Sequence, residues 1–386
     1  MISITKLLCN SENYGDSLRY VEGAALEKYG VSPGKGPVVA WNCTKTCNLK
    51  CKHCYASADN KRYEGELTLN ESKKLIDDLK EFNVPALLFS GGEPLMKENI
   101  LDILDYSNQR KIRSTISTNG TLLDKDICKT LKKLNLGYVG VSLDGIGSNH
   151  DNFRGVKGAF NSALTGIRNC IEVNQKVGLR FTISKDNYKD LEDIFNLIKE
   201  EKIPRVCFYH LVYSGRGSKI MNTDISKEET RQVLDLIMRK AIEFGPSVEI
   251  LTVDNHADAV YTYLRSLKKF THKSENILKL LTTNGGNRSG MAFANIDFYG
   301  NVHPDQFTWQ YTFGNVKEES FGSIWRNSKH EILEGLRNRK ELLKGRCSHC
   351  RWLNICNGNF RTRAEAVYND FWAEDPACYL TDEEII

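Results

Sequence analysis

Six β-prone apolar runs alternate with amphipathic, helix-forming stretches from residue 38 onward, and this alternation restricts the fold more than any other feature of the chain. The stretch TLNESKKLIDDLKEF, for example, opens with Thr68 and Glu71 at the spacing of a helix capping box. Strand–helix units in succession form a parallel sheet with helices outside, and right-handed crossovers curl such a sheet into a barrel. The apolar runs cover residues 38–44, 85–90, 112–118, 138–143, 177–184 and 205–212.

The six units predict an α/β fold built on a partial (β/α)6 TIM-like barrel, two units short of a complete eightfold barrel. The run VEILTV at 248–253 predicts a further strand at the sheet edge. Two short β-prone runs across residues 299–301 predict a hairpin, and a helix is expected to follow near 321–344. We expect four parts: an N-terminal extension over 1–37, the barrel over 38–215, a helical linker or barrel completion over 216–284, and a C-terminal α+β unit over 285–386.

Charge and hydropathy exclude several classes of protein. The formal charge is +4, from 53 Lys and Arg against 49 Asp and Glu, which is too slight to indicate a nucleic-acid partner, although it suits a substrate that carries carboxylates. The N-terminal segment lacks the pattern of an export signal. No apolar run approaches the roughly 20 residues that span a bilayer, so we expect a cytoplasmic protein without a membrane partner. The sequence leaves the oligomeric state open.

Seven of the twelve cysteines gather in two short regions, residues 47–54 and 347–378. In a reducing compartment such clusters indicate metal or iron–sulfur ligation and not disulfides. Cys47, Cys51 and Cys54 are spaced C-x3-C-x2-C directly after the first predicted strand. Structural zinc needs four protein ligands, for which His53 is the available fourth, whereas a cubane cluster on three cysteines keeps one iron open.

The pattern CxxxCxxC followed by an aromatic residue, here Tyr55, resembles the signature of the radical S-adenosylmethionine (SAM) enzymes. The resemblance implies that the three cysteines hold a [4Fe-4S] cluster whose open iron binds SAM. It also implies reductive cleavage of SAM to a 5′-deoxyadenosyl radical, with an electron supplied by a low-potential flavodoxin or ferredoxin. Cluster potentials tuned as low as roughly −700 mV make such a reduction possible.

Further loops fit this family. FSGGEPL at 89–95 follows the second predicted strand, where Gly-Gly and Pro also suit a tight turn, and STNG and SLDG end the third and fourth. The resemblance implies that the first loop contacts the methionyl ammonium and that the others contact ribose or carboxylate. Ser184, which ends the fifth strand, and Arg216, beyond the sixth, are further candidates, although Arg216 also suits a solvated loop. The residues carried over from the three loops are Gly91, Gly92, Glu93, Pro94, Thr118, Asn119, Ser142 and Asp144.

The second cysteine group supplies four thiolates, enough to close a [4Fe-4S] or a zinc site. Its C-x2-C-x5-C spacing and the upstream runs IDFYGNVHPDQF and FGNVKEESFGSIW resemble the C-terminal SPASM or twitch extension of radical SAM enzymes, which carries auxiliary clusters. Asp305 and the residues of NGNF stand where a second auxiliary cluster would need cysteines, so we expect one auxiliary cluster. Asp305 and His303 remain alternative metal ligands, against structural roles in the turn and the core. The four cysteines are Cys347, Cys350, Cys356 and Cys378.

The substrate can be addressed through a narrower resemblance. The segments MISITKLLCNSENYGDSLRY, GKGPVVAWN, VHPDQF and CNGNFRTRAEA resemble the NirJ and AhbC proteins, which modify tetrapyrroles. The resemblance implies radical removal of acetate or propionate side chains from a sirohaem-derived tetrapyrrole such as 12,18-didecarboxysirohaem. Candidate partners for the substrate carboxylates are Arg180, Arg216, Arg288, Arg361 and Arg363.

Two other functions remain open on the sequence alone. The first is a radical SAM maturase that oxidises or crosslinks a ribosomal peptide; such enzymes commonly begin with a peptide-recognition domain, for which the 37 residues before the first strand are too few. The second is a non-catalytic iron–sulfur or zinc protein, which the retention of GGEP beside CxxxCxxC disfavours.

Overall fold

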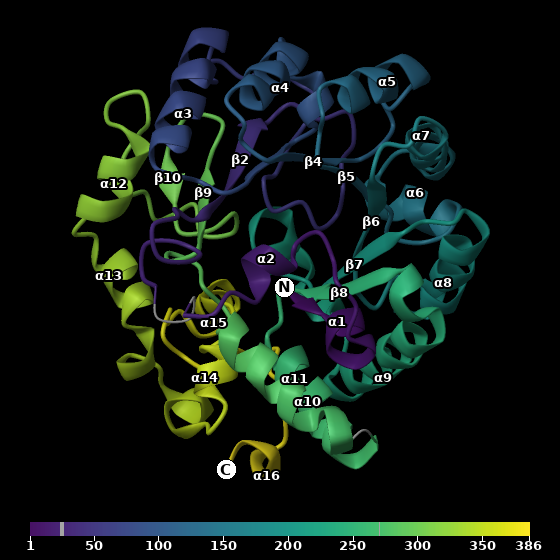
Figure 1. Ribbon diagram of the computed structural model, residues 1–386, viewed down its shortest axis with the longest axis vertical. Coiled ribbons are helices and arrows are strands. Elements are labelled where there is room, and N and C mark those ends of the chain that lie inside the picture. The colour runs from purple at the N-terminus through teal and green to yellow at the C-terminus, as the bar shows by residue number, and fades with distance from the viewer. Residues whose placement is uncertain (24–26, 270) are drawn as a thin grey trace.

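The fold of the chain is seen in a computed structural model that describes residues 1–23, 27–269 and 271–386. Its centre is one ten-stranded sheet in the order β1-β8-β7-β6-β5-β4-β3-β2-β9-β10. In Figure 1 the strands curve around a central space and the helices form an outer ring. The strands are β1 (Ile2–Ser3), β2 (Val38–Thr44), β3 (Leu87–Gly91), β4 (Ser114–Thr118), β5 (Tyr138–Ser142), β6 (Val177–Thr182), β7 (Arg205–Tyr209), β8 (Glu249–Val253), β9 (Phe293–Ile296) and β10 (Val302–His303).

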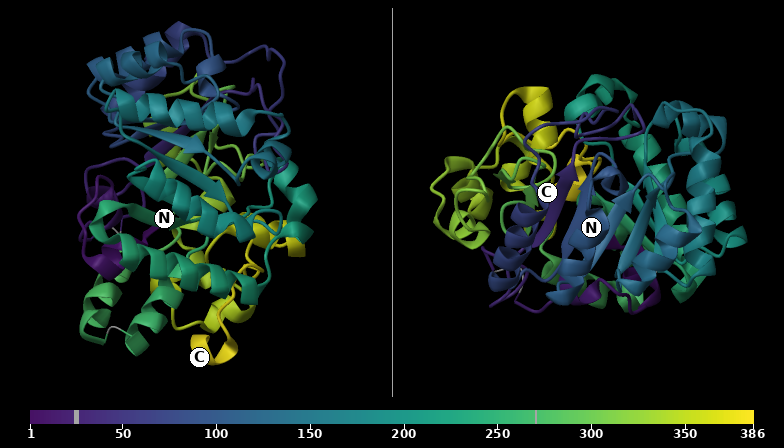
Figure 2. Two further views of the ribbon diagram at one scale, coloured as in Figure 1. Left: turned by 90° about the vertical axis from the view of Figure 1, so that its right-hand side faces the viewer. Right: turned by 90° about the horizontal axis from the view of Figure 1, so that it is seen from above.

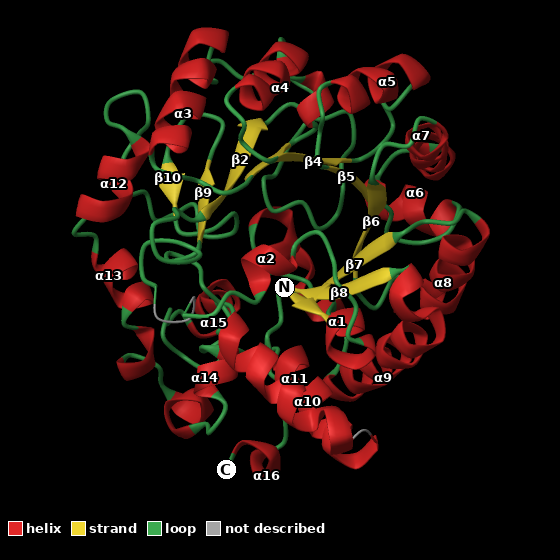
Figure 3. Cartoon of the chain, in the orientation of Figure 1, coloured by secondary structure: helices red, strands yellow, loops and turns green. Residues whose placement is uncertain are grey.

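The six predicted strands are confirmed as β2 to β7, all parallel. Figure 2 shows helices covering the outside of this sheet, and Figure 3 shows their alternation with the strands. The predicted capping box is present, because Thr68 accepts from the Glu71 backbone and Glu71 accepts from that of Thr68. The helices that follow the strands are α3 (Leu69–Glu81), α4 (Ile100–Gln109), α5 (Lys125–Lys133), α6 (Ser148–Arg154), α7 (Ala159–Glu172), α8 (Leu191–Glu200) and α9 (Lys227–Phe244).

The apolar core lies between the sheet and this outer ring of helices. Trp41 and Phe89 point outward from neighbouring strands, are fully buried, and pack with ring centroids 5.5 Å apart. The apolar side chains that α3 buries toward the sheet are Leu75, Ile76 and Leu79. Side chains alternate along a strand, so the other residues of each strand face the lumen of the barrel. The cavities described below lie in this lumen.

The prediction of an edge strand at 248–253 needs correction. β8 lies inside the sheet, parallel to β7 and antiparallel to β1, because residues 2–3 add a short strand beyond it. The N-terminal extension is therefore part of the sheet. The described remainder of the N-terminal and linking segments forms α1 (Ile4–Cys9), α2 (Asp16–Arg19), α10 (Ala257–Lys269) and α11 (Thr271–Asn284).

The C-terminal region continues the same sheet. The predicted hairpin is confirmed as β9 and β10, and β9 pairs in parallel with β2. The helix expected near 321–344 is broken in two, because Ser328 is extended and the His330 side chain caps a new helix. Among the described helices, none is both long and apolar enough to cross a membrane. The C-terminal helices are α12 (Phe321–Asn327), α13 (Glu331–Arg337), α14 (Leu353–Cys356), α15 (Arg361–Tyr368) and α16 (Asp382–Ile385).

Asn295 on β9 joins the C-terminal region to the barrel. Its side-chain amide donates to the Ala40 carbonyl at 2.8 Å and to the Asn42 side chain at 2.6 Å, and its carbonyl accepts from Trp309 at 2.8 Å. Asn42 in turn donates to the Tyr55 hydroxyl at 2.8 Å. Because Asn295 is fully buried, its own polar groups have no water as a substitute partner.

We expect Asn295→Ala to lower the free energy of unfolding by about 2–4 kcal/mol, since it leaves buried polar groups without partners. Chemical denaturation under anaerobic conditions measures the change. Asn161→Ala, on the exposed face of α7, serves as the control and should alter stability by less than about 0.5 kcal/mol. Equal effects of the two substitutions would contradict the role assigned to Asn295.

Candidate active site

A cavity with about 990 Å³ of empty space opens at the carboxyl ends of the parallel strands. The side chains that form it come from the loops after β2 to β7 and from the segment after β10, which contributes Gln306 and Phe307. Active sites of barrel enzymes lie at this end, because the loops there converge. Of the residues named from the sequence, the cavity is lined by Cys47, Cys51, Cys54, Tyr55, Gly91, Gly92, Thr118, Asn119, Ser142, Arg180 and Arg216.

The three cysteines of the first group lie in one loop on the cavity wall. Helix α6 supports this loop, because the Lys50 and Lys52 backbone amides donate to the carbonyls of Arg154 and Phe153. Burial raises the pKa of the Cys47 thiol to about 12, so a bound cation must favour the thiolate if the residue is to act as a ligand. Three cysteine thiols beside an open cavity fit a [4Fe-4S] cluster that keeps one iron accessible.

An ion pair between Arg154 and Asp144 lies directly behind these cysteines. Arg154 also donates to the Cys51 sulfur at 3.5 Å, and Asp144 accepts from the Thr182 backbone at 2.5 Å. Burial alone would raise the pKa of Asp144, but the Arg154 guanidinium holds this pKa below its usual value. Asp144 thus has no exposed oxygen to offer a ribose, and its position behind the wall differs from the predicted direct contact.

His53 lies in the same group and bears on the zinc alternative. Its ring stacks on Phe153 with centroids 4.7 Å apart, and Nε2 lies 3.9 Å from the Asp144 carboxylate. Burial lowers the pKa of His53 to about 4. The His53 ring therefore packs on helix α6. Among the described residues, no group of three or more His, Cys, Asp or Glu side chains is close enough to hold a single metal ion.

The GGEP loop is shaped by close backbone packing. Gly91 has φ +140°, and a Cβ there would lie 2.2 Å from the Thr44 carbonyl; at Gly92 it would lie 2.3 Å from the Thr46 carbonyl. The glycines therefore let β3 end against the cysteine loop, and both also line the cavity. The sequence reasoning proposed their approach to a ligand but missed their approach to the backbone of the cysteine loop.

Glu93 differs from the expectation of a free carboxylate. It is fully buried, and it accepts from the Thr118 hydroxyl at 2.7 Å, the Asn119 backbone at 2.7 Å and the Leu95 backbone at 3.1 Å. It ties the ends of β3 and β4 together behind the wall. Pro94 begins a short 3-10 helix beside it. A direct contact of either residue with a cofactor stays a prediction.

Ser184 and Arg216 occupy different positions from each other. Ser184 is fully buried and donates to Asn187, so it too lies behind the wall. Arg216 lines the cavity and is not solvated; it donates to the carbonyls of Cys51 and Ala58 at 2.8 and 2.7 Å. It therefore supports the cysteine loop from the side opposite to Arg154.

Of the five candidate arginines, Arg216 donates to the two carbonyls named above, and three others need correction because they too contact other protein groups. Arg288 donates to the carbonyls of Glu27 and Gly30, at the amino end of the barrel. Arg361 donates to the carbonyls of Gly358 and Ala373 near the second cysteine group. Arg363 is paired with Asp375 at 2.7 Å, and both side chains are fully buried. Arg180 remains: its guanidinium lies 4.5 Å from the centre of the Tyr209 ring, and no carboxylate among the described residues pairs with it.

His210 is a cavity residue that the sequence reasoning missed, because no motif surrounds it. Its Nε2 lies 2.9 Å from Asp258, whose other oxygen accepts from the Tyr379 hydroxyl at 2.8 Å. Burial alone would lower the pKa of His210, but the Asp258 carboxylate raises this pKa above its usual value. Since Tyr379 follows Cys378, this buried chain of hydrogen bonds runs from the cavity to the second cysteine group.

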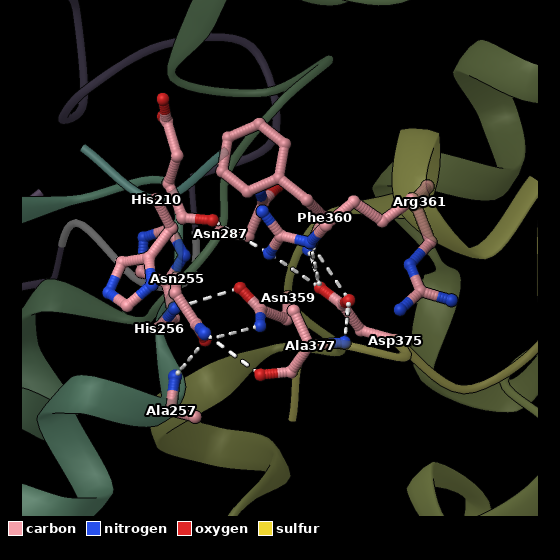
Figure 4. Close-up of polar contacts among 12 residues, drawn as sticks. His210, Asn255, His256, Ala257, Asn287, Asn359, Phe360, Arg361, Asp375 and Ala377 are labelled. Atoms are coloured by element: carbon pink, nitrogen blue, oxygen red, sulfur yellow. Dashed lines mark hydrogen bonds and ion pairs between the residues drawn. The ribbon is translucent and has the colours of Figure 1, made fainter. Parts of the chain in front are cut away.

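The four C-terminal cysteines come together outside the barrel. Cys347 lies within the 3-10 helix Gly345–His349, Cys350 caps the end of that helix, Cys356 ends α14, and the Cys378 backbone donates to the Asp375 carbonyl. Burial, and then the charges of Cys378, Cys347, Asp375 and Cys350, raise the pKa of Cys356. Figure 4 shows Asp375, Ala377 and Phe360 joined by hydrogen bonds beside His256 and His210. A thiolate-only donor set suits an iron–sulfur cluster.

The two alternative ligands of the hairpin have protein partners. Asp305 accepts from the Phe307 backbone at 2.9 Å and the Thr308 hydroxyl at 3.0 Å, as a turn residue does. His303 is buried, with Nδ1 2.9 Å from the Tyr311 carbonyl and Nε2 3.4 Å from Asp297. Both residues therefore stabilise the hairpin.

Comparison with known proteins agrees with this geometry. Residues 41–198 match the radical SAM superfamily, and residues 289–351 match the SPASM iron–sulfur cluster-binding domain. The chain is 52% identical to the Fe-coproporphyrin III synthase of Methanosarcina barkeri over its whole length and 99% of that protein. This chain is a radical SAM enzyme.

A further relative agrees with this family membership, and a solved structure shares the fold. The pre-heme d1 synthase of Dinoroseobacter shibae is 41% identical over 90% of this chain and 87% of that protein. The crystal structure of SuiB from Streptococcus suis bound to S-adenosylmethionine superposes with a TM-score of 0.72, covering 90% of this chain and 78% of that one. At 18% identity this second likeness establishes the fold, a radical SAM partial barrel with a SPASM region. Family membership thus brings a SAM-binding [4Fe-4S] cluster and SPASM iron–sulfur ligation to this chain.

The His210–Asp258 pair predicts a pH dependence of stability. A histidine whose pKa is raised by folding stabilises the protein fully below its unfolded value, about 6.5, and this contribution is lost as the pH rises through the folded value. We therefore expect His210→Gln to destabilise the chain more at about pH 6 than at about pH 8.5. Denaturation midpoints measured anaerobically at the two pH values check this. His272→Gln, at an exposed helical position, should show no such trend, and a deficit that grows with pH would contradict the pairing.

Proposed function

We propose that this chain removes acetate or propionate side chains from a sirohaem-derived tetrapyrrole such as 12,18-didecarboxysirohaem. The observation that carries the proposal is the full-length identity of 52% with a Fe-coproporphyrin III synthase, together with a cavity whose loops match the radical SAM pattern. When bound, the reduced cluster and SAM supply the 5′-deoxyadenosyl radical that abstracts a hydrogen atom from the substrate. The chain's own residues bind, orient and enclose these groups.

The cysteine loop is held between two arginines. Arg154 and Arg216 contact the Cys51 side chain and backbone respectively, so they fix the thiolates against the cavity. The Tyr55 hydroxyl is hydrogen-bonded to the Ser90 hydroxyl on β3 at 3.1 Å, which joins the cysteine loop to that strand. Gly91, Gly92, Thr118, Asn119 and Ser142 line the same wall and are the residues we assign to SAM.

Arg180 is the residue we assign to a substrate carboxylate. It lies on β6 in the cavity wall, its guanidinium faces Tyr209, and it forms no ion pair with a described carboxylate, although the charge of Asp254, which also lines the cavity, acts on it. Its planar fork matches a carboxylate in geometry and charge. Gly140 on the neighbouring strand makes room for it, since a Cβ there would lie 2.8 Å from the Arg180 side chain.

We further propose that the four C-terminal cysteines hold one auxiliary [4Fe-4S] cluster and that a flavodoxin or ferredoxin supplies electrons. Four cysteines whose charges act on one another support the cluster, and the nearby Asp375 carboxylate is paired with Arg363. All twelve cysteines are free thiols, which supports a reducing, cytoplasmic setting.

The reaction is tested by anaerobic reconstitution followed by incubation with didecarboxysirohaem, SAM and dithionite. The expected products are 5′-deoxyadenosine and a porphyrinoid lighter by the mass of the lost side chains, both detected by mass spectrometry. SAM cleavage without a tetrapyrrole product would overturn the substrate and leave the enzyme class intact, and the peptide-maturase alternative would then be tested with a precursor peptide.

Arg180→Gln should raise the KM for the tetrapyrrole by about tenfold or more, because a charge-assisted hydrogen bond is lost. SAM cleavage without substrate should remain near the wild-type rate. Steady-state assays of both activities separate the two effects. Lys176→Gln, which removes a nearby charge outside the cavity wall, is the control. An unchanged KM in Arg180→Gln would remove this residue from substrate binding.

Iron and sulfide analysis tests the cluster count. Two cubanes predict about eight irons per chain, and loss of either cluster leaves about four. Cys47→Ala should lose SAM cleavage and about half the iron, whereas Cys378→Ala should lose iron from the auxiliary site only. About four irons with one zinc in the wild-type protein would contradict the auxiliary cubane.

A further inference from the structure

A second cavity lies at the amino ends of the same strands, opposite the candidate active site, and encloses about 1180 Å³ of empty space. Its wall includes Val38, Tyr138 and Arg205, the first residues of β2, β5 and β7, whereas the active-site cavity is formed at the other ends of these strands. The segment around α2 covers it, and Figure 1 places α2 and the N-terminus near the centre of the ring.

Two lumen positions near this cavity carry glycine, and the side chains of Tyr138 and Arg180 occupy the room that these glycines leave. A complete barrel fills its interior with layers of bulky branched residues. In this chain Gly140 and Gly178 take two of these lumen positions; a Cβ at Gly178 would lie 2.7 Å from the Tyr138 hydroxyl. The remaining floor and walls include Leu88 and Phe293, so most of the surface is apolar.

Arginines give this apolar cavity a positive charge. Five of them line it, and none of the described lining residues is an Asp or Glu. Arg19 and Arg205 are partly neutralised by Glu249, at 2.5 and 3.3 Å. None of the other three, Arg113, Arg180 and Arg288, forms an ion pair with a carboxylate of the described residues, although the charge of Asp254 acts on Arg180 and that of Glu27 on Arg288.

The contacts of these three arginines show an unmet demand for an anion. Arg113 donates only to the Tyr14 carbonyl at 2.6 Å, and its guanidinium lies 3.2 Å from the centre of the Tyr14 ring. The Nε of Arg288 is buried without a hydrogen-bond partner in the described structure, as is the hydroxyl of Tyr138. Burial lowers the pKa of Arg113 and lowers that of Arg288 to about 10, and for Arg288 the charge of Glu27 offsets only part of this effect.

We propose that this amino-end cavity binds an organic carboxylate with an apolar body, at a site separate from the SAM cavity. The apolar part of the ligand would pack on the apolar floor of the cavity. Its carboxylate would pair with the arginines, whose planar guanidinium groups match a carboxylate in geometry. Arg180 and Ser117 line both cavities, so the two sites share one wall. The proposal is independent of the reaction assigned above.

Binding is measured anaerobically on the reconstituted holoenzyme saturated with SAM, with 1-pyrenebutyrate as the probe and fluorescence anisotropy as the readout. We expect one saturable site per chain. The neutral analogue 1-pyrenebutanol should bind at least about tenfold more weakly, since it cannot pair with the guanidinium groups. Absence of saturable binding, equal binding of the two probes, or a probe affinity on the SAM-free holoenzyme that falls when SAM is added would each overturn the proposal.

A matched pair of variants locates the site. Arg113→Gln should weaken 1-pyrenebutyrate binding by about tenfold, whereas Arg110→Gln, three residues away on the exposed surface and paired with Asp77, should not. Unchanged iron content and SAM cleavage show that Arg113→Gln is folded. If that variant does not assemble, Thr115→Leu narrows the cavity and should weaken binding instead. The proposal would be overturned if Arg113→Gln, or Thr115→Leu in its place, bound the probe as tightly as the wild type. The tetrapyrrole assay tests the reaction separately.

Discussion

The buried ion pair between Asp144 and Arg154 is the interaction on which the active-site wall depends. A carboxylate that is fully buried is tolerated only with a charged partner and hydrogen bonds, and Asp144 has both. Through this pair, the end of β5 is joined to the start of the β6 loop, to helix α6 and to the sulfur of Cys51. The three thiols are therefore positioned by charge pairing and backbone bonds from outside their own loop.

Much of the fold could be predicted from the sequence, because it follows from local periodicity. Each of β2 to β7 is a short apolar run bounded by turn residues, and the cysteine spacing fixes the two iron–sulfur regions. Pairings between distant segments could not be predicted. Nothing in Ile2 or Phe293 indicates that one will extend the sheet beyond β8 and the other will lie beside β2, since such pairings depend on the assembled sheet.

The candidate site shows the same limit. Motifs located the thiols and the glycine loop, but they did not distinguish residues on the cavity wall from those behind it. Asp144 and Glu93 belong to the motifs and are buried behind the wall, whereas His210 belongs to no motif and lies on it. Arg363 was a candidate for the substrate and instead joins Asp375 to the carbonyls of Leu211 and Asp254, so it links the cavity wall to the second cysteine group.

The pairing of β1 with β8 has a consequence for how the chain folds. Ile2 lies beside Thr252, so the beginning of the polypeptide finds its partner only after two-thirds of the molecule has been synthesised. Contacts between such distant segments close late and slow the search for the native state. During translation residues 2–3 therefore stay without a strand partner until β8 has been synthesised, and until then the edge of the nascent sheet at β7 is exposed to association with other chains.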